Sequence, residues 1–159
     1  MKKVLFIIAV TLAACSSKNV KNDNAIAGIM PVDIYKNLED KNFSLNKNFH
    51  GADGNSWVCT SKNEGEELSA TVFSHDINTV ESISATIICS PPKVASSHVD
   101  FLQYVSTVAY DSSQPKEVSL WVGKNINKDK ASTNIGGVSF IINAPTKWAR
   151  TLTIEKANK

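Results

Sequence analysis

The sequence predicts an α+β fold, with a mostly antiparallel sheet, a short N-terminal helix and a central helical hairpin. Short segments in which apolar and polar residues alternate come in runs, as at 43–49, 57–60 and 68–74. Between residues 97 and 126, two segments carry apolar residues at helical spacing. Strands that come in runs favour antiparallel pairing, because parallel strands need crossover connections.

The first helix is expected to begin at Pro31, because the fixed φ of proline suits the first helical turn and Asp33 complements the helix dipole there. Strands should follow as far as Cys89, the last of them in the β-branched segment 80–89. That strand should end at Pro91, since proline cannot donate a ladder hydrogen bond.

The second half is expected to open with the helical hairpin. Ser97 and Asp100 have the spacing of a capping box, and Pro115 suits the start of a second helix. The charged segment 127–134 is expected to be a loop, and 138–154 a closing β-hairpin.

The N-terminal residues have the layout of an export signal. Lys2 and Lys3 precede residues 4–14, which are apolar apart from Thr11. As a helix this segment would rise about 16 Å, roughly half of a ~30 Å hydrocarbon core. It therefore predicts a segment for processing and not an ordinary membrane span.

The stretch Leu12-Ala13-Ala14-Cys15 resembles the lipobox of bacterial lipoprotein precursors. The resemblance implies a diacylglycerol on Cys15, cleavage before Cys15, and acylation of the new amine. Several acyl chains would make the anchor stable, whereas one chain binds a membrane only marginally. Ser16, in place of an aspartate, implies the outer membrane of a Gram-negative envelope. The alternative is a plain signal peptide with a chance cysteine.

This interpretation divides the chain into a signal peptide at 1–14, a lipidated cysteine and flexible tether at 15–28, and a single domain at 29–159. The whole chain has a formal charge of +2 from 17 basic and 15 acidic residues. Cleavage removes Lys2 and Lys3, so the mature chain is neutral. Nucleic acid is therefore not an expected partner.

Cys59 and Cys89 remain once Cys15 is lipidated, and an oxidising compartment favours a disulfide between them. The alternative is two small buried thiols. In a simple meander the strand containing Ala70 would separate the two cysteines, which would prevent a bridge.

A search for catalytic and metal-binding motifs leads to no catalytic, metal or cofactor site. His50, His75 and His98 are too far apart for metal-ligand spacing, so each is expected to be a surface or cap residue. Ser74-His75-Asp76 cannot act as a triad on a strand, because neighbouring residues point to opposite faces.

Arg150 is the candidate binding residue. It shares strand parity with Leu152 and Ile154, so its guanidinium should point toward an apolar face, where an unpaired charge is costly. In one interpretation it lies near the hairpin turn with its stem along Trp148. In the other it belongs to a small polar recognition point. Trp57, Trp121 and Trp148 are expected to be core anchors, with a binding groove as the alternative.

The expected function is that of a membrane-anchored, non-catalytic binding or scaffold domain of the cell envelope. Its expected partners are the membrane, through the lipid, and another envelope protein or a cell-wall component. One alternative is a small periplasmic hydrolase, which a contact between His75 or His98 and a carboxylate in a cleft would favour. Another is a purely structural surface lipoprotein.

Overall fold

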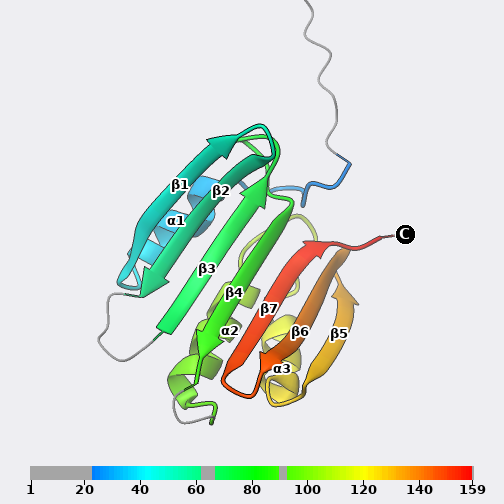
Figure 1. The fold of residues 1–159 in the computed structure, drawn as a ribbon. Coiled ribbons are helices and arrows are strands. Elements are labelled where there is room, and N and C mark those ends of the chain that lie inside the picture. Colours follow the sequence, from blue (N-terminus) through cyan, green and yellow to red (C-terminus); the bar gives the residue numbers. More distant parts are fainter. Residues whose placement is uncertain (1–22, 62–66, 90–92, 159) are drawn as a thin grey trace, which may run out of the picture.

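A seven-stranded antiparallel sheet dominates the computed structural model, with the strand order β1-β2-β3-β4-β7-β6-β5. The structure describes residues 23–61, 67–89 and 93–158. The predicted signal peptide, the lipobox with Cys15, and the first part of the predicted tether lie outside these residues. In Figure 1 the three helices lie together behind the sheet, so they cover one of its two faces.

The elements follow one another in the order α1 (Pro31–Glu39), β1 (Phe43–Gly51), β2 (Gly54–Ser61), β3 (Glu67–Ser74), β4 (Ser82–Ile88), α2 (Ser96–Ser106), α3 (Pro115–Asn125), β5 (Lys130–Ile135), β6 (Val138–Thr146) and β7 (Ala149–Lys156). None of the helices in this described part is long and apolar enough to span a membrane.

Two meanders meet in the middle of the sheet. Strands β1 to β4 form the first, with α1 packed on β1, β2 and β3. Strands β5 to β7 form the second, and β7 pairs with β4. The pairing runs from Ser82 opposite Glu155 to Ile88 opposite Ala149, so a single set of ladder hydrogen bonds joins the two halves.

The core lies between the sheet and the helices. On β2, β3 and β4, buried residues alternate with partly exposed ones, as expected when one face of an antiparallel sheet is covered. Across the central pair, Leu152 lies opposite Ala85 and Ile154 opposite Ile83, all fully buried. Burying one such aliphatic side chain contributes about 1.5–3 kcal/mol.

The predicted fold class is wrong, because the described residues form a dominant sheet with three separate helices and no helical hairpin. The link between α2 and α3, residues 107–114, is longer than the ~2–5 residues of an αα-hairpin loop. This link is itself anchored: Asp111 N donates to Ala27 O at 2.9 Å, and Tyr110 Oη donates to Ile135 O at 3.0 Å. The link is therefore an anchored segment of the domain and not a short turn between the two helices.

The expected loop at 127–134 is also wrong, because β5 occupies Lys130–Ile135. Along β5 fully exposed and partly exposed residues alternate until Ile135, which is buried. As an edge strand it pairs only with β6. Segment 130–135 is a strand because of its ladder hydrogen bonds with β6. Its polar sequence lacks the apolar alternation from which a strand is predicted.

Ile26 lies within the predicted tether but contacts the folded domain. Ile26 forms an isolated antiparallel bridge with Val80, in which Ile26 N donates to Val80 O at 2.7 Å. Its side chain is 4% exposed. The polar surroundings of residues 26–28 favour a flexible tether, whereas burial of this isoleucine shows that it packs against the domain.

Candidate functional site

Arg150 lies on the covered face of the sheet, as its strand parity predicts. It sits near the start of β7, directly opposite Ile87 of β4, and Leu152 and Ile154 follow it on the same face. These three apolar side chains are fully buried, whereas Arg150 is half-buried. The guanidinium therefore interrupts an apolar surface at the edge of the core.

Main-chain oxygens of the β6–β7 turn hold the guanidinium. Arg150 Nη1 donates to Thr146 O at 3.2 Å and to Ala149 O at 2.9 Å. Arg150 Nε is buried, and none of the described residues accepts a hydrogen bond from it. A buried donor without an acceptor costs about 1–3 kcal/mol, so the edge of the core carries one unsatisfied polar group here. Arg150 is thus tied to the turn, as the first interpretation expects, and its role in binding stays a prediction.

A pocket of about 270 Å³ opens beside this guanidinium. Its lining residues, which together we call the basic pocket, are Cys89, Lys93, Val94, Asn127, Lys147 and Arg150. Three of these side chains are cationic and none is acidic, so the charge is not balanced within the lining. Helix α2 begins two residues after Val94, and its N-terminal end carries partial positive charge.

Cys89 contributes a neutral thiol to the basic pocket. Its Sγ lies 3.8 Å from His98 Nδ1, and that nitrogen also accepts a hydrogen bond from Ala95 N at 3.1 Å. Because Nδ1 is the acceptor in the Ala95 contact, the thiol is the donor toward it. Burial raises the pKa of the Cys89 thiol, an effect that the positive charge of Arg150 opposes. A protonated, buried thiol is a poor nucleophile, and it leaves the pocket positively charged.

The predicted Cys59–Cys89 disulfide is wrong for this structure, in which both residues are free, buried thiols. Cys59 lies opposite Ala70 of β3, and Ala70 lies opposite Ala85 of β4. Strand β3 therefore separates the two cysteine-bearing segments. Two inter-strand steps of about 4.8 Å each already exceed the ~7 Å between Cα atoms that a disulfide tolerates.

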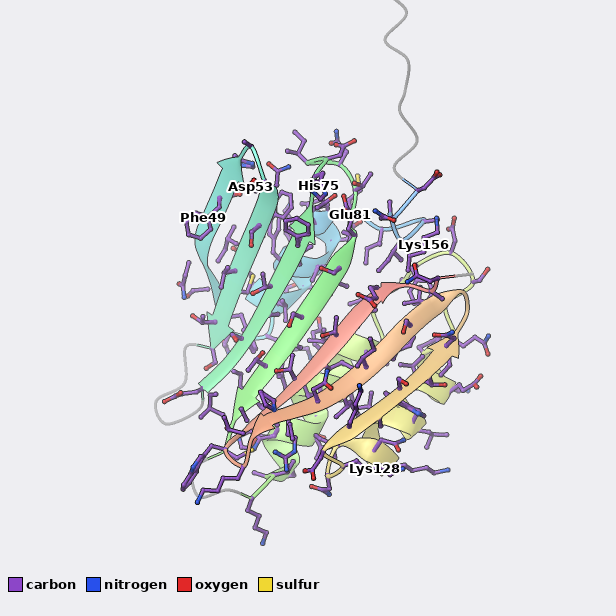
Figure 2. All side chains as sticks on the ribbon, turned by 45° about the vertical axis from the view of Figure 1, so that its right-hand side comes forward. Phe49, Asp53, His75, Glu81, Lys128 and Lys156 are labelled. Carbon is purple, nitrogen blue, oxygen red and sulfur yellow. The ribbon has the colours of Figure 1, made fainter. Side chains whose placement is uncertain are left out.

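At the other end of the sheet, an imidazole and a carboxylate are in contact between β3 and β4 (Figure 2). His75 Nδ1 lies 2.9 Å from Glu81 Oε2, and His75 N donates to Glu81 Oε1 at 2.9 Å. The Glu81 side chain is 9% exposed and that of His75 is 63% exposed. Ser74 Oγ donates to Glu81 Oε1 at 3.3 Å and does not bond to the imidazole. This differs from a Ser-His-acid triad, in which the histidine lies between the other two.

Glu81 also lines an open cleft of about 850 Å³ at this end, together with Asp23, Glu155 and Lys156. Lys156 Nζ donates to the main-chain oxygen of Asp23, where the described chain begins. Figure 2 places Lys156 at this end and Lys128 at the opposite end. Asn127, which precedes Lys128 in the chain, lines the basic pocket. The described residues contain no group of three or more His, Cys, Asp or Glu side chains that could hold a metal ion.

The face of the sheet opposite the helices, which we call the open face, carries rows of small polar side chains. One row crosses β2 to β6 through Thr60, Ser69, Thr86, Thr151 and Asn143. The next row comprises Val58, Thr71, Ser84, Thr153 and Ile141. All ten residues are partly exposed. The hydroxyl oxygens of Thr86 and Thr151 lie 3.3 Å apart, so neighbouring strands are also linked through their side chains.

The three tryptophans do not behave alike. Trp57 is a core anchor at 5% exposure, and Trp121 packs half-buried against the core. Trp148 is 41% exposed in the β6–β7 turn, so its assignment to the core is wrong. Lys147 Nζ lies 5.1 Å from the centre of the Trp148 ring, a cation–π contact at the rim of the basic pocket.

Sequence reasoning missed Lys93, Lys147 and Glu81 as members of sites. Lys93 follows β4 and Lys147 precedes β7, and the two lysines line one pocket because β4 pairs with β7. Glu81 lies just before β4 in an otherwise apolar segment. A single carboxylate in such a segment is the sequence feature that could have indicated a buried site residue.

No protein-family model, curated protein or solved structure matches this chain.

Proposed function

We propose that this chain is a lipid-anchored protein of the bacterial envelope, and that its folded domain is a non-catalytic binding module. The anchor rests on the sequence, where Lys2, Lys3, the apolar segment 4–14 and Cys15 form the signal peptide and lipobox pattern. Ser16 supports the outer membrane as the location, with the domain facing the periplasm or the cell surface. The expected modification is a diacylglycerol on Cys15.

The open face is the observation that carries the binding role. All three helices cover the other face, so a sheet seven strands wide presents its side chains to a partner (Figure 1). Serine and threonine hydroxyls both donate and accept hydrogen bonds. Their short side chains lose less rotamer entropy on docking than lysine or glutamate would. Such a surface suits another flat, polar macromolecular surface.

Another envelope protein fits this face better than a cell-wall glycan. The two rows described above contain no aromatic residue, and the aromatic side chains of this face, Phe49 and Phe73, lie in the next row toward one end of the strands. The two rows do contain Val58 and Ile141, which add apolar contact area among the hydroxyls. Non-obligate protein interfaces are about as apolar as the rest of a protein surface, so a face of hydroxyls with a few apolar groups can form one.

Site-specific photo-crosslinking in cells tests the binding role. A photoreactive amino acid replaces Thr71, Ser84 or Thr153 on the open face, and matched controls replace Lys116 or Leu120, which are exposed on α3. The open-face positions should give one discrete adduct with a protein, and the α3 positions should not. The same adduct from both sets, or none from the open face, would contradict the proposed surface and favour a purely structural lipoprotein.

Metabolic labelling with a palmitate analogue tests the anchor separately. The wild-type chain should be labelled and the Cys15→Ala variant should not. A labelled Cys15→Ala variant would rule out lipidation at this cysteine.

The contact between His75 and Glu81 favours a second candidate, a small periplasmic hydrolase. The exposed imidazole beside a buried carboxylate could activate water as a general base. Ser74 does not supply the nucleophile in this arrangement, because its buried hydroxyl bonds to Glu81 and also contacts Thr79 Oγ1 at 2.7 Å. Hydrolysis of chromogenic esters by the wild type, lost in both His75→Ala and Glu81→Gln, would establish this candidate in place of the first.

A further inference from the structure

The basic pocket carries three cationic side chains and is separate from the open face. It lies on the covered side of the sheet, where β4 ends and β7 begins, and residues before α2 and after α3 complete it. Its lining therefore comes from three separate parts of the chain, namely residues 89 and 93–94, residue 127, and residues 147 and 150. The proposal below depends on neither the lipid anchor nor the open face.

Arg150 provides a fixed hydrogen-bonding group in this pocket. Because Nη1 donates to Thr146 O and Ala149 O, the guanidinium plane is set by the main chain of the turn. Arg150 Nε has no acceptor among the described residues. Because Nη1 is engaged and Nε is buried, Nη2 is the nitrogen that can donate a charge-assisted hydrogen bond to an oxyanion in the pocket, and little side-chain freedom remains to be lost here on binding.

The charges of Lys93 and Lys147 add to that of Arg150. Both lysines are exposed at their tips, so they can move toward a ligand as flexible point charges. The other lining residues are uncharged, since Cys89 is a protonated thiol and Val94 and Asn127 carry no charge. Three positive groups around one small cavity repel one another, and an anion between them would remove that repulsion.

We propose that the basic pocket binds the phosphoryl group of a phosphomonoester. A phosphomonoester carries close to two negative charges at neutral pH, because its second pKa is about 6. Two charges match three cations better than the single charge of a carboxylate. The cavity of about 270 Å³ accommodates a phosphoryl group with a small substituent, whereas larger ligands would extend outside it.

Calorimetric titration of the purified full-length protein in detergent, at pH 8 and moderate ionic strength, tests the site with inorganic phosphate as the probe. The wild type should bind one phosphate saturably. Arg150→Gln should weaken phosphate binding at least tenfold. Arg150→Lys should restore part of the affinity, because it returns the positive charge without the planar guanidinium. Acetate should bind much more weakly than phosphate.

Lys128→Gln is the matched control, since Lys128 is an exposed lysine at the same end of the sheet that does not line the pocket. It removes one positive charge, as Arg150→Gln does, but should leave phosphate affinity within about twofold. If Arg150→Gln fails to fold, the double variant Lys93→Gln/Lys147→Gln tests the pocket at exposed positions and should also lose at least tenfold.

The proposal is overturned if phosphate affinity is unchanged in Arg150→Gln or in the double lysine variant. Equal losses in Lys128→Gln, or acetate binding as tight as phosphate binding, would also overturn it. Two further arms distinguish the sources of the phosphoryl group. Arg150-dependent flotation with phosphatidic acid vesicles would support a lipid headgroup, and Arg150-dependent titration with glycerol 3-phosphate alone would support a soluble ester.

Discussion

His98 Nδ1 accepts a hydrogen bond from the backbone N–H of Ala95 at 3.1 Å. Through this contact the imidazole caps α2, taking the role that the sequence assigned to Ser97 and Asp100. The same imidazole lies beside Cys89 and is 7% exposed. The first turn of α2 and the thiol of the basic pocket therefore depend on one side chain.

His98→Ala should lower the free energy of unfolding by about 1–2 kcal/mol, because the N-terminal N–H of α2 loses its acceptor. His98→Gln should recover part of this, since a glutamine at the third helical position can accept a hydrogen bond from the N-cap N–H, as in a capping box. Urea denaturation followed by circular dichroism measures both. An unchanged midpoint in His98→Ala would contradict the capping role.

Both cysteines should be protected in the folded protein. Cys59 is 0% exposed and Cys89 is 1% exposed, and neither is bridged. A thiol reagent should therefore react with neither residue in native protein, and with both after unfolding without reductant. Protein lacking both reactive thiols after unfolding would show that a bridge forms and that strand β3 does not separate the two.

Stability should fall in alkaline solution because of Cys59. Burial raises the pKa of this thiol from 9.0 to about 11, and Glu39 adds to the effect. The folded state thus holds its proton more tightly than the unfolded state. The contribution is fully present below pH 9 and is lost between pH 9 and about 11, a loss of about 2–3 kcal/mol.

Other groups titrate in the same range, so the comparison with Cys59→Ala isolates the thiol. Urea midpoints measured from pH 8 to 11 should fall more steeply for the wild type than for the variant. Parallel curves would mean that Cys59 ionises equally easily in both states.

Gly136 should tolerate alanine less well than its neighbour Gly137. Both have positive φ, at 60° and 78°, but a Cβ on Gly136 would lie 2.3 Å from Ser112 O. A Cβ on Gly137 would meet nothing within 4 Å. Gly137→Ala should cost about 1–2 kcal/mol for the backbone conformation alone, and Gly136→Ala clearly more. Thermal melting tests whether Gly136→Ala is less stable than Gly137→Ala. Similar losses of stability would contradict the close approach of Gly136 to Ser112 O.

Ile26→Ala should destabilise the domain by about 2–4 kcal/mol, as expected for truncating a buried isoleucine. Ala25→Ser, one position earlier, is a suitable control because it changes a residue outside the bridge. Chemical denaturation of the two variants distinguishes a docked segment from a flexible tether. A loss below about 0.5 kcal/mol, of the size typical for surface changes, would support the predicted boundary at residue 29.

The local alternation of apolar and polar residues predicted most strands. Strand β5 and the strand order depend on long-range pairing, which the sequence does not show. The alternation around Trp57, Val72 and Ile83 places strands correctly, because a covered face requires an apolar residue at every second position. Strand β5 has no such pattern, since its side chains lie at the polar edge of the sheet. It exists because β6 offers a free edge for pairing.

The candidate site shows the same division. The parity of Arg150 predicted its position on the covered face, since side chains on a strand alternate strictly. Its neighbours Lys93 and Lys147 come from distant positions that the β4–β7 pairing brings together. The cysteine prediction failed for a related reason: cysteine counts indicate a possible bridge, but strand order decides the distance.

The last strand of the chain lies in the middle of the sheet. A polypeptide that leaves the ribosome amino terminus first can complete the β1–β4 meander early, but β4 keeps an unpaired edge until Ala149–Lys156 emerge. Exposed strand edges are sites of aggregation. A truncation near the carboxyl terminus would therefore leave two incomplete sheets with unpaired, aggregation-prone edge strands. It would not simply shorten the domain.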